Sequence, residues 1–178
     1  MQENIQTIYQ KTIAFAAQKH GSQKMPGGLP YIVHLSNVAM EVFMAHKKEP
    51  NFNIELAIQL ALLHDVLEDT TLSFKELEDF SDGVVARGVL ALTKNKSLDK
   101  KDQMQDCLTR IVKQDKEVAI VKLCDRITNL QKPPVKWDKE KIKKYHLQAV
   151  TIAQALEGKN AYLDKRILGK IKDYAAFV

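Results

Sequence analysis

The sequence is poor in residues that break or cross-link a chain: its 178 residues include seven glycines, five prolines and two cysteines. So little glycine and proline excludes collagen-like and low-complexity proteins. Cys107 and Cys124 lack the spacing of metal ligands and are too few for a disulfide framework. The first ten residues are polar and include an acid, unlike a secretory signal. The longest uncharged stretch near the middle of the chain, 56–64, is too short to span a bilayer. These absences predict a cytoplasmic protein that does not bind membranes.

Aromatic residues and arginine are also scarce. Aromatic residues make up 7% of the chain, and only 4 of the 27 basic residues are arginine. The net charge of +5 is uneven: residues 1–112 carry 12 basic and 14 acidic side chains, whereas residues 113–178 carry 15 and 8. A basic segment of this kind suits an anionic partner. Because aromatic and arginine side chains are few and no finger-like or RNP-like motif is present, we expect no nucleic-acid binding.

Apolar residues recur at helical spacing along the chain, and no long segment alternates with the two-residue period of a strand. The spacing predicts helices near 5–19, 31–45, 83–92, 138–156 and 161–175, with loops at 20–30 and 93–101. Further helices are expected to begin after the capping residues Asn53, Ser73 and Asp115, and after Leu98 or Asp99. The helix after Asn53 is expected to continue through Leu67. The sequence therefore predicts one all-α domain over residues 1–178, with about eight or nine helices.

Polar residues interrupt the most apolar of these helices, in the segment LALLHDVLEDT (60–70). On one helix, the i,i+4 relation would place Glu68 above His64 and Asp69 above Asp65. Three acids crowded beside a histidine repel one another unless a cation lies among them. The segment is therefore typical either of a divalent metal site or of a helix end that turns into solvent.

Two other apolar segments contain similar residues: His34 follows the apolar residues of PYIVHL (30–35), and Asp125 lies in KLCDRITNL (122–130). Taken singly, His34 fits a core or capping histidine, and Asp125 fits a surface pair with Arg126. Taken together, His34, His64, Asp65 and Asp125 offer mixed nitrogen and oxygen ligands that suit Mn²⁺, Fe²⁺ or Mg²⁺. Without cysteine ligands, structural zinc is disfavoured.

The order H…HD…D resembles the HD metal-dependent phosphohydrolases, and in particular the hydrolase domain of RelA/SpoT proteins and the stand-alone small alarmone hydrolases. The resemblance rests on segments that span nearly the whole chain in the family's order: FAAQKHGSQK (15–24), LPYIVH (29–34), ALLHDVLEDT (61–70), LTK (92–94), IVKLCDRITNL (120–130) and KIKKYHLQA (141–149). It covers only the hydrolase half of RelA/SpoT proteins, and no synthetase half is expected.

The resemblance implies an all-α HD fold that removes pyrophosphate from the 3′ position of ppGpp or pppGpp, giving GDP or GTP. It implies one Mn²⁺ held by His34, His64, Asp65 and Asp125. Glu68 and Asp69 would then act on the attacking water, which also fits their place one turn beyond two ligands. The predicted substrate-binding residues combine cations for phosphate with residues that the family places at the nucleotide: Lys24, Tyr31, Lys94, Arg126, Asn129, Lys141 and Tyr145.

The sequence departs from the family in the loop that usually carries an arginine to stack on guanine. Here the loop reads QKMPGG, and Lys24 is the nearest cation. Lysine lacks the planar face of a guanidinium. An HD phosphohydrolase for another nucleotide, such as NADPH or a nucleoside phosphate, is therefore one alternative. Two further alternatives are a nucleotide sensor without turnover and a basic protein that binds nucleic acid.

Overall fold

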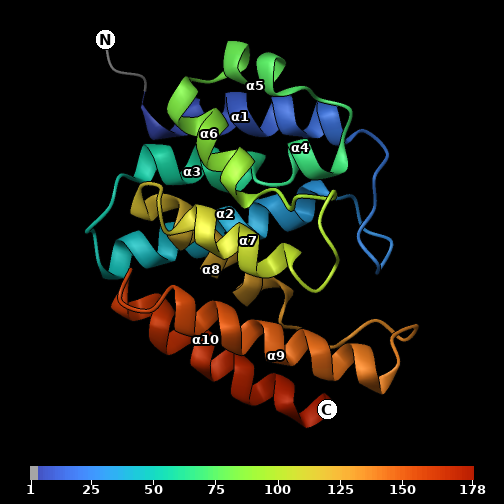
Figure 1. The fold of residues 1–178 in the computed structure, drawn as a ribbon. Coiled ribbons are helices and arrows are strands. Elements are labelled where there is room, and N and C mark those ends of the chain that lie inside the picture. The colour runs from blue at the N-terminus through green and yellow to red at the C-terminus, as the bar shows by residue number, and fades with distance from the viewer. Residues whose placement is uncertain (1–3) are drawn as a thin grey trace.

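The computed structural model describes residues 4–178, and this part of the chain contains helices and no strands (Figure 1). The first helices are α1 (Ile5–His20), α2 (Ile32–Lys48), α3 (Ile54–Leu63), α4 (Val66–Asp69) and α5 (Phe74–Phe80). They are followed by α6 (Gly83–Leu92), α7 (Gln103–Ile111), α8 (Lys116–Asn129), α9 (Lys139–Ala155), α10 (Ala161–Tyr174) and the 3₁₀ helix η1 (Ala175–Phe177). The all-α prediction is confirmed.

Side-chain caps fix where several helices begin, as the sequence predicted. Asn53 accepts hydrogen bonds from the backbone amides of Glu55 and Leu56, which starts α3. Ser73 and Glu76 form a reciprocal capping box at the start of α5. Asp115 occupies the N-cap position of α8, although its side chain makes no capping bond.

Two predicted helix boundaries were wrong. The helix that begins after Asn53 ends at Leu63, and the single turn α4 follows the break at His64 and Asp65. His64 and Asp65 therefore do not lie on one regular helix with Glu68. The helix predicted to begin after Leu98 or Asp99 begins at Gln103 instead, because Asp102 first closes a turn onto the Asp99 carbonyl.

One hydrophobic core joins the helices. Its buried residues run from Ala16 in α1 to Tyr174 in α10, and α8 is buried along its whole length from Glu117 to Thr128. In Figure 1, α9 and α10 form an antiparallel hairpin on one side of the molecule, and α1 and α5 lie on the opposite side. Because α8 crosses the interior, its polar residues are held inside the protein. Within residues 4–178, no helix is long and apolar enough to cross a membrane.

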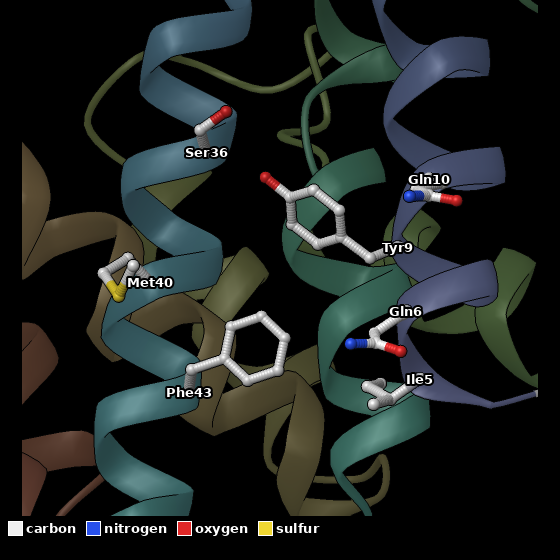
Figure 2. A pocket seen from close by; sticks show the side chains of 7 residues that line it. All are labelled: Ile5, Gln6, Tyr9, Gln10, Ser36, Met40 and Phe43. Atoms are coloured by element: carbon white, nitrogen blue, oxygen red, sulfur yellow. The ribbon is translucent and has the colours of Figure 1, made fainter.

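A surface groove of about 470 Å³ separates α1 from α2, and Figure 2 shows the side chains that line it. Tyr9 of α1 and Phe43 of α2 project toward each other across it, with ring centroids 6.2 Å apart. The remaining lining residues are amides, a hydroxyl and apolar side chains: Ile5, Gln6, Gln10, Ser36 and Met40. The groove thus holds no carboxylate, histidine or cation, and the polar residues singled out in the sequence lie elsewhere.

Candidate metal centre and the residues around it

Two buried histidines from the ends of two helices face each other. His34 lies in the first turn of α2, and His64 directly follows the last residue of α3. Both residues are 3% exposed, and their Nε2 atoms are 3.4 Å apart. The Nδ1 of His64 lies 2.8 Å from the carbonyl oxygen of Ala61, which accepts its hydrogen. The Nε2 lone pair of His64 is thereby directed at His34.

Two aspartates complete the cluster. The Oδ1 of Asp125, on the buried helix α8, lies 3.4 Å from His34 Nε2 and 3.7 Å from His64 Nε2. The Oδ2 of Asp65 lies 3.0 Å from His64 Nε2 and 3.9 Å from His34 Nε2. Ligand atoms of His34, His64 and Asp125 all lie within 4.8 Å of one another. The structure thus brings all four predicted ligands together, with Asp65 at the edge of the group.

Neighbouring side chains orient the two carboxylates. Tyr31 donates its hydroxyl hydrogen to Asp65 Oδ2. Lys122, one turn before Asp125 on α8, donates to Asp125 Oδ2 at 3.1 Å, and the Asn129 amide donates to Asp125 Oδ1 at 2.5 Å. Such partners fix the direction of a ligand oxygen before an ion binds.

The charges of the cluster depend on one another. Burial lowers the pKa of His64, but the carboxylate of Asp65, and then that of Asp125, outweighs this effect and raises the pKa to about 9. Burial raises the pKa of Asp125, but Lys122 and the two histidines hold it well below its usual range. Burial, with the charge of Asp65, raises the pKa of Tyr31, so its phenol remains a hydrogen-bond donor.

These residues fit a divalent metal ion. Two imidazole nitrogens and two carboxylate oxygens converge in the interior, and only a cation can satisfy so many lone pairs at one point. The raised pKa of His64 has the same cause, because the two carboxylates favour positive charge at this point. The donor set of two nitrogens and two oxygens suits a borderline or hard divalent ion.

The two acids beyond the cluster have different surroundings. Glu68 accepts hydrogen bonds from the Lys94 ammonium at 2.7 Å and from the Lys94 backbone amide at 3.0 Å. Asp69 is exposed and accepts one hydrogen bond, to Oδ2, from the Gln23 amide at 2.9 Å. Within residues 4–178, Asp69 Oδ1 has no hydrogen-bond partner. The carboxylate of Asp69 therefore keeps a free oxygen, whereas both oxygens of Glu68 are occupied.

A row of cations and rings extends from α8 onto α9. The guanidinium of Arg126 lies 4.1 Å from the ring centroid of Tyr145, and the Tyr145 ring meets Trp137 edge to face at 5.0 Å. The Lys141 ammonium lies 4.5 Å from the Trp137 ring centroid. Arg126 is 4% exposed, and its Nε and Nη1 have no hydrogen-bond partner among the described residues. These two buried N–H groups are able to donate hydrogen bonds to an anion.

Of the residues predicted from the sequence to bind substrate, Tyr31 and Asn129 donate hydrogen bonds to cluster carboxylates, and Tyr145 packs on Arg126, the neighbour of Asp125. Lys94 pairs with Glu68, whereas Lys141 contacts the Trp137 ring, farther along α9. Lys24 is exposed in the loop between α1 and α2, where its backbone forms a bridge with Pro30. Sequence reasoning missed Lys122, Gln23 and Trp137. Lys122 carried a usable signal, because it interrupts the apolar run VAIVKLC three residues before Asp125.

An all-helical bundle around two buried histidines and two aspartates defines a metalloprotein of the HD type. The model of the HD-domain family matches residues 12–159, and this chain belongs to that family. It is 34% identical over 163 residues to guanosine-3′,5′-bis(diphosphate) 3′-pyrophosphohydrolase of Danio rerio, covering 88% of each chain. It is 31% identical over 159 residues to the Mus musculus protein of the same name, covering 86% of this chain and 87% of the relative.

A solved structure of a metazoan ortholog of SpoT, described as hydrolysing ppGpp and as playing a role in starvation responses, is similar throughout. Its TM-score is 0.81 at 27% identity, and the match covers 97% of each chain. The match confirms the HD fold predicted from the sequence.

Proposed function

We propose that this protein is a metal-dependent hydrolase of guanosine 3′,5′-bis(diphosphate) and its pentaphosphate. Water adds to the phosphorus attached to the ribose 3′ oxygen, the bond between them breaks, and pyrophosphate and GDP or GTP are released. The observation that carries the proposal is the convergence of His34, His64 and Asp125, with Asp65 at 3.0 Å from His64, in a chain similar to named pyrophosphohydrolases. Those relatives match over 86 to 88% of this chain.

The ion is Mn²⁺ in this proposal, and His34, His64, Asp65 and Asp125 hold it. Bound there, it supplies positive charge to the reacting phosphoryl oxygens and lowers the pKa of a water molecule. The two histidines contribute neutral nitrogens, and Tyr31, Lys122 and Asn129 hold the carboxylates in place.

Asp69 accepts the proton of the attacking water, because its Oδ1 is free while Gln23 holds its Oδ2. Glu68 acts beside it by holding Lys94, whose ammonium it binds at 2.7 Å. Lys94 then presents a positive charge to the diphosphate at the rim of a cavity of about 440 Å³ that Glu68 also lines.

The substrate's phosphates and base are bound by the remaining residues. Arg126 provides guanidinium nitrogens that have no partner within residues 4–178, and Tyr145 holds that guanidinium through its ring. Asn129 lies at the ribose, Lys141 adds charge at the edge of the site, and Tyr31 borders the substrate beside Asp65. Lys24 reaches the base from the loop between α1 and α2, because that exposed position leaves its ammonium free to move.

Residues 1–178 form a single HD phosphohydrolase domain in this proposal, supported by one core that joins α1 to α10. The protein acts in the cytoplasm, where its nucleotide substrate occurs, and its two buried cysteines are unpaired. Its partner is a phosphorylated guanine nucleotide, and we expect neither nucleic acid nor a membrane to bind.

The test is hydrolysis of ppGpp by the purified protein, with the products identified by chromatography and mass spectrometry. We expect GDP and pyrophosphate in equal amounts with Mn²⁺, and no turnover with a chelator. A parallel panel should include pppGpp, NADPH, GTP and GMP at one concentration. Faster turnover of NADPH or GTP than of ppGpp would contradict the proposed substrate, and tight ppGpp binding without products would identify a sensor.

A further inference from the structure

The loop between α1 and α2 closes into a small hairpin that directs one side chain toward the catalytic acids. The Gln23 carbonyl accepts a hydrogen bond from the Tyr31 amide at 3.0 Å, and the Leu29 carbonyl accepts one from the Met25 amide at 2.8 Å. In an extended segment, neighbouring side chains point to opposite faces. Gln23 is accordingly half-buried, whereas Lys24 is exposed.

The Gln23 amide joins two residues that lie far apart in the sequence. Its Nε2 donates to Asp69 Oδ2 at 2.9 Å, and its Oε1 lies 2.7 Å from His20 Nδ1. A carboxylate only accepts hydrogen bonds, so the NH₂ group of Gln23 must face Asp69, and the oxygen must face His20. His20 therefore carries its hydrogen on Nδ1 and donates it to Gln23.

His20 is a rigid support for this amide. It is 6% exposed and ends α1, and its ring stacks on that of Tyr31 with centroids 4.8 Å apart. Its Nε2 is buried without a hydrogen-bond partner among the described residues. A hydrogen on Nε2 would be a buried, unsatisfied N–H, which favours the tautomer with its hydrogen on Nδ1. Tyr31, on which it stacks, donates to the proposed metal ligand Asp65.

We propose that Gln23 is a positioning residue for Asp69. The Gln23 amide binds Oδ2 of Asp69 and so aims the free Oδ1 of Asp69 at the attacking water. The hydrogen bond from His20 fixes the Gln23 amide in the orientation that this contact needs. This inference rests on the proposed function, in which Asp69 takes the proton of water. Because Gln23 precedes Lys24, the segment that receives the nucleotide also orients the proton acceptor.

The test compares Gln23→Leu, Gln23→Glu and the control Gln18→Leu, which makes the same change at an exposed position of α1. For Gln23→Leu we expect kcat for ppGpp to fall about 10- to 100-fold, the effect of a misplaced catalytic group. KM and the Kd for Mn²⁺ should stay within twofold of wild type, and Gln18→Leu should retain wild-type kinetics. Gln23→Glu keeps the shape but sets a second carboxylate against Asp69, so the acidic limb of the kcat/KM profile should move to higher pH.

A double-mutant cycle shows whether Gln23 acts through Asp69. In an Asp69→Asn background, Gln23→Leu should lower kcat by less than twofold, because the group that it positions is already lost. The proposal would be overturned if Gln23→Leu lowered kcat as much in the Asp69→Asn background as in wild type. It would also be overturned if Gln23→Leu alone kept the wild-type kcat, or if it weakened Mn²⁺ binding as much as it lowered kcat.

A crystal structure of Gln23→Leu gives a readout without substrate. We expect the Asp69 carboxylate to leave its wild-type rotamer or to occupy several rotamers, and an unchanged single rotamer would overturn the proposal. Wild-type protein that fails to hydrolyse ppGpp would refute the proposed function instead, and the Asp69 rotamer would still decide the role of Gln23.

Discussion

The Nε2 atoms of His34 and His64 lie 3.4 Å apart in the interior, and the carboxylates of Asp65 and Asp125 flank the His64 nitrogen at 3.0 and 3.7 Å. Neutral imidazole nitrogens at this distance present lone pairs to each other, so either a proton or a metal ion must lie between them. This relationship ties the stability of the fold to occupancy of the site.

Metal binding should raise the thermal stability, and His64 should be required for the rise. An ion that binds only the folded state stabilises it by about 2.7 kcal/mol at 100 times its Kd. We expect Mn²⁺ to raise the Tm of wild-type protein in a thermal-shift assay, and His64→Ala and Asp65→Ala to lose both the rise and the hydrolysis. His46→Ala is the control, since His46 packs on Phe52 away from the cluster, and it should keep the Mn²⁺-dependent rise. Mn²⁺-dependent turnover by His64→Ala would refute the ligand assignment.

Lys122→Met should destabilise the metal-free protein more than the Mn²⁺-loaded one. Lys122 is 7% exposed and pairs with Asp125 at 3.1 Å. Burial lowers its pKa, but Asp125 outweighs burial and raises it, so the pair is ionic. Removing one partner of a buried pair costs about 3 to 5 kcal/mol, and a bound cation restores a positive charge beside Asp125.

Urea unfolding with chelator and with Mn²⁺ measures the loss of stability in the metal-free and the Mn²⁺-loaded protein, and Lys143→Met serves as an exposed control. Equal losses under the two conditions would contradict this account.

The sequence predicted the helices because apolar spacing and capping residues are local patterns. It predicted the four-residue cluster because its members interrupt apolar segments that are separated by whole helices. It failed at the break after Leu63, where Leu67 continues the apolar spacing and nothing local marks the end of α3. It also could not assign different partners to Glu68 and Asp69. Their partners, Lys94 and Gln23, come from segments 26 residues ahead and 46 residues behind. Contacts of that kind depend on tertiary packing, which single-sequence spacing does not encode.

Glu68 and Lys94 should behave as one unit in catalysis. We expect Glu68→Gln and Lys94→Met each to lower kcat for ppGpp about 100-fold, the scale of losing one preorganised charge at the reacting group. Because each partner acts through the 2.7 Å ion pair, the double variant should be hardly slower than either single one. Steady-state kinetics measure the three variants, and all should bind Mn²⁺ as wild type does. Multiplied losses in the double variant would show that the two residues act independently.

Arg126→Met should stabilise the substrate-free protein and weaken substrate binding. The buried guanidinium leaves Nε and Nη1 without partners among residues 4–178. A buried unsatisfied polar group costs about 1 to 3 kcal/mol, and an apolar side chain of similar length removes that cost. Loss of the contact with Tyr145 offsets about 1 kcal/mol of that gain. We expect a higher Tm by calorimetry, together with a KM for ppGpp raised at least tenfold. A lower Tm with unchanged KM would assign Arg126 a purely structural role.

Two glycines in helices should respond in opposite ways to alanine. A Cβ at Gly88 of α6 would lie 2.6 Å from Leu60 Cδ2 and 3.2 Å from Val118 Cγ2, so α6 packs on α3 and α8 only because Gly88 has no side chain. Gly88→Ala should therefore destabilise the protein by about 1 to 3 kcal/mol through overpacking. A Cβ at Gly169 of α10 meets nothing within 4 Å, so Gly169→Ala should stabilise it by about 0.5 to 1 kcal/mol through helix propensity. Urea unfolding of both variants tests the pair. Leu60 lies in the last turn of α3, and His64 directly follows that helix. The Mn²⁺-dependent rise in Tm should therefore shrink in Gly88→Ala and persist in Gly169→Ala. An equal rise in both variants would show that this packing does not affect the metal centre.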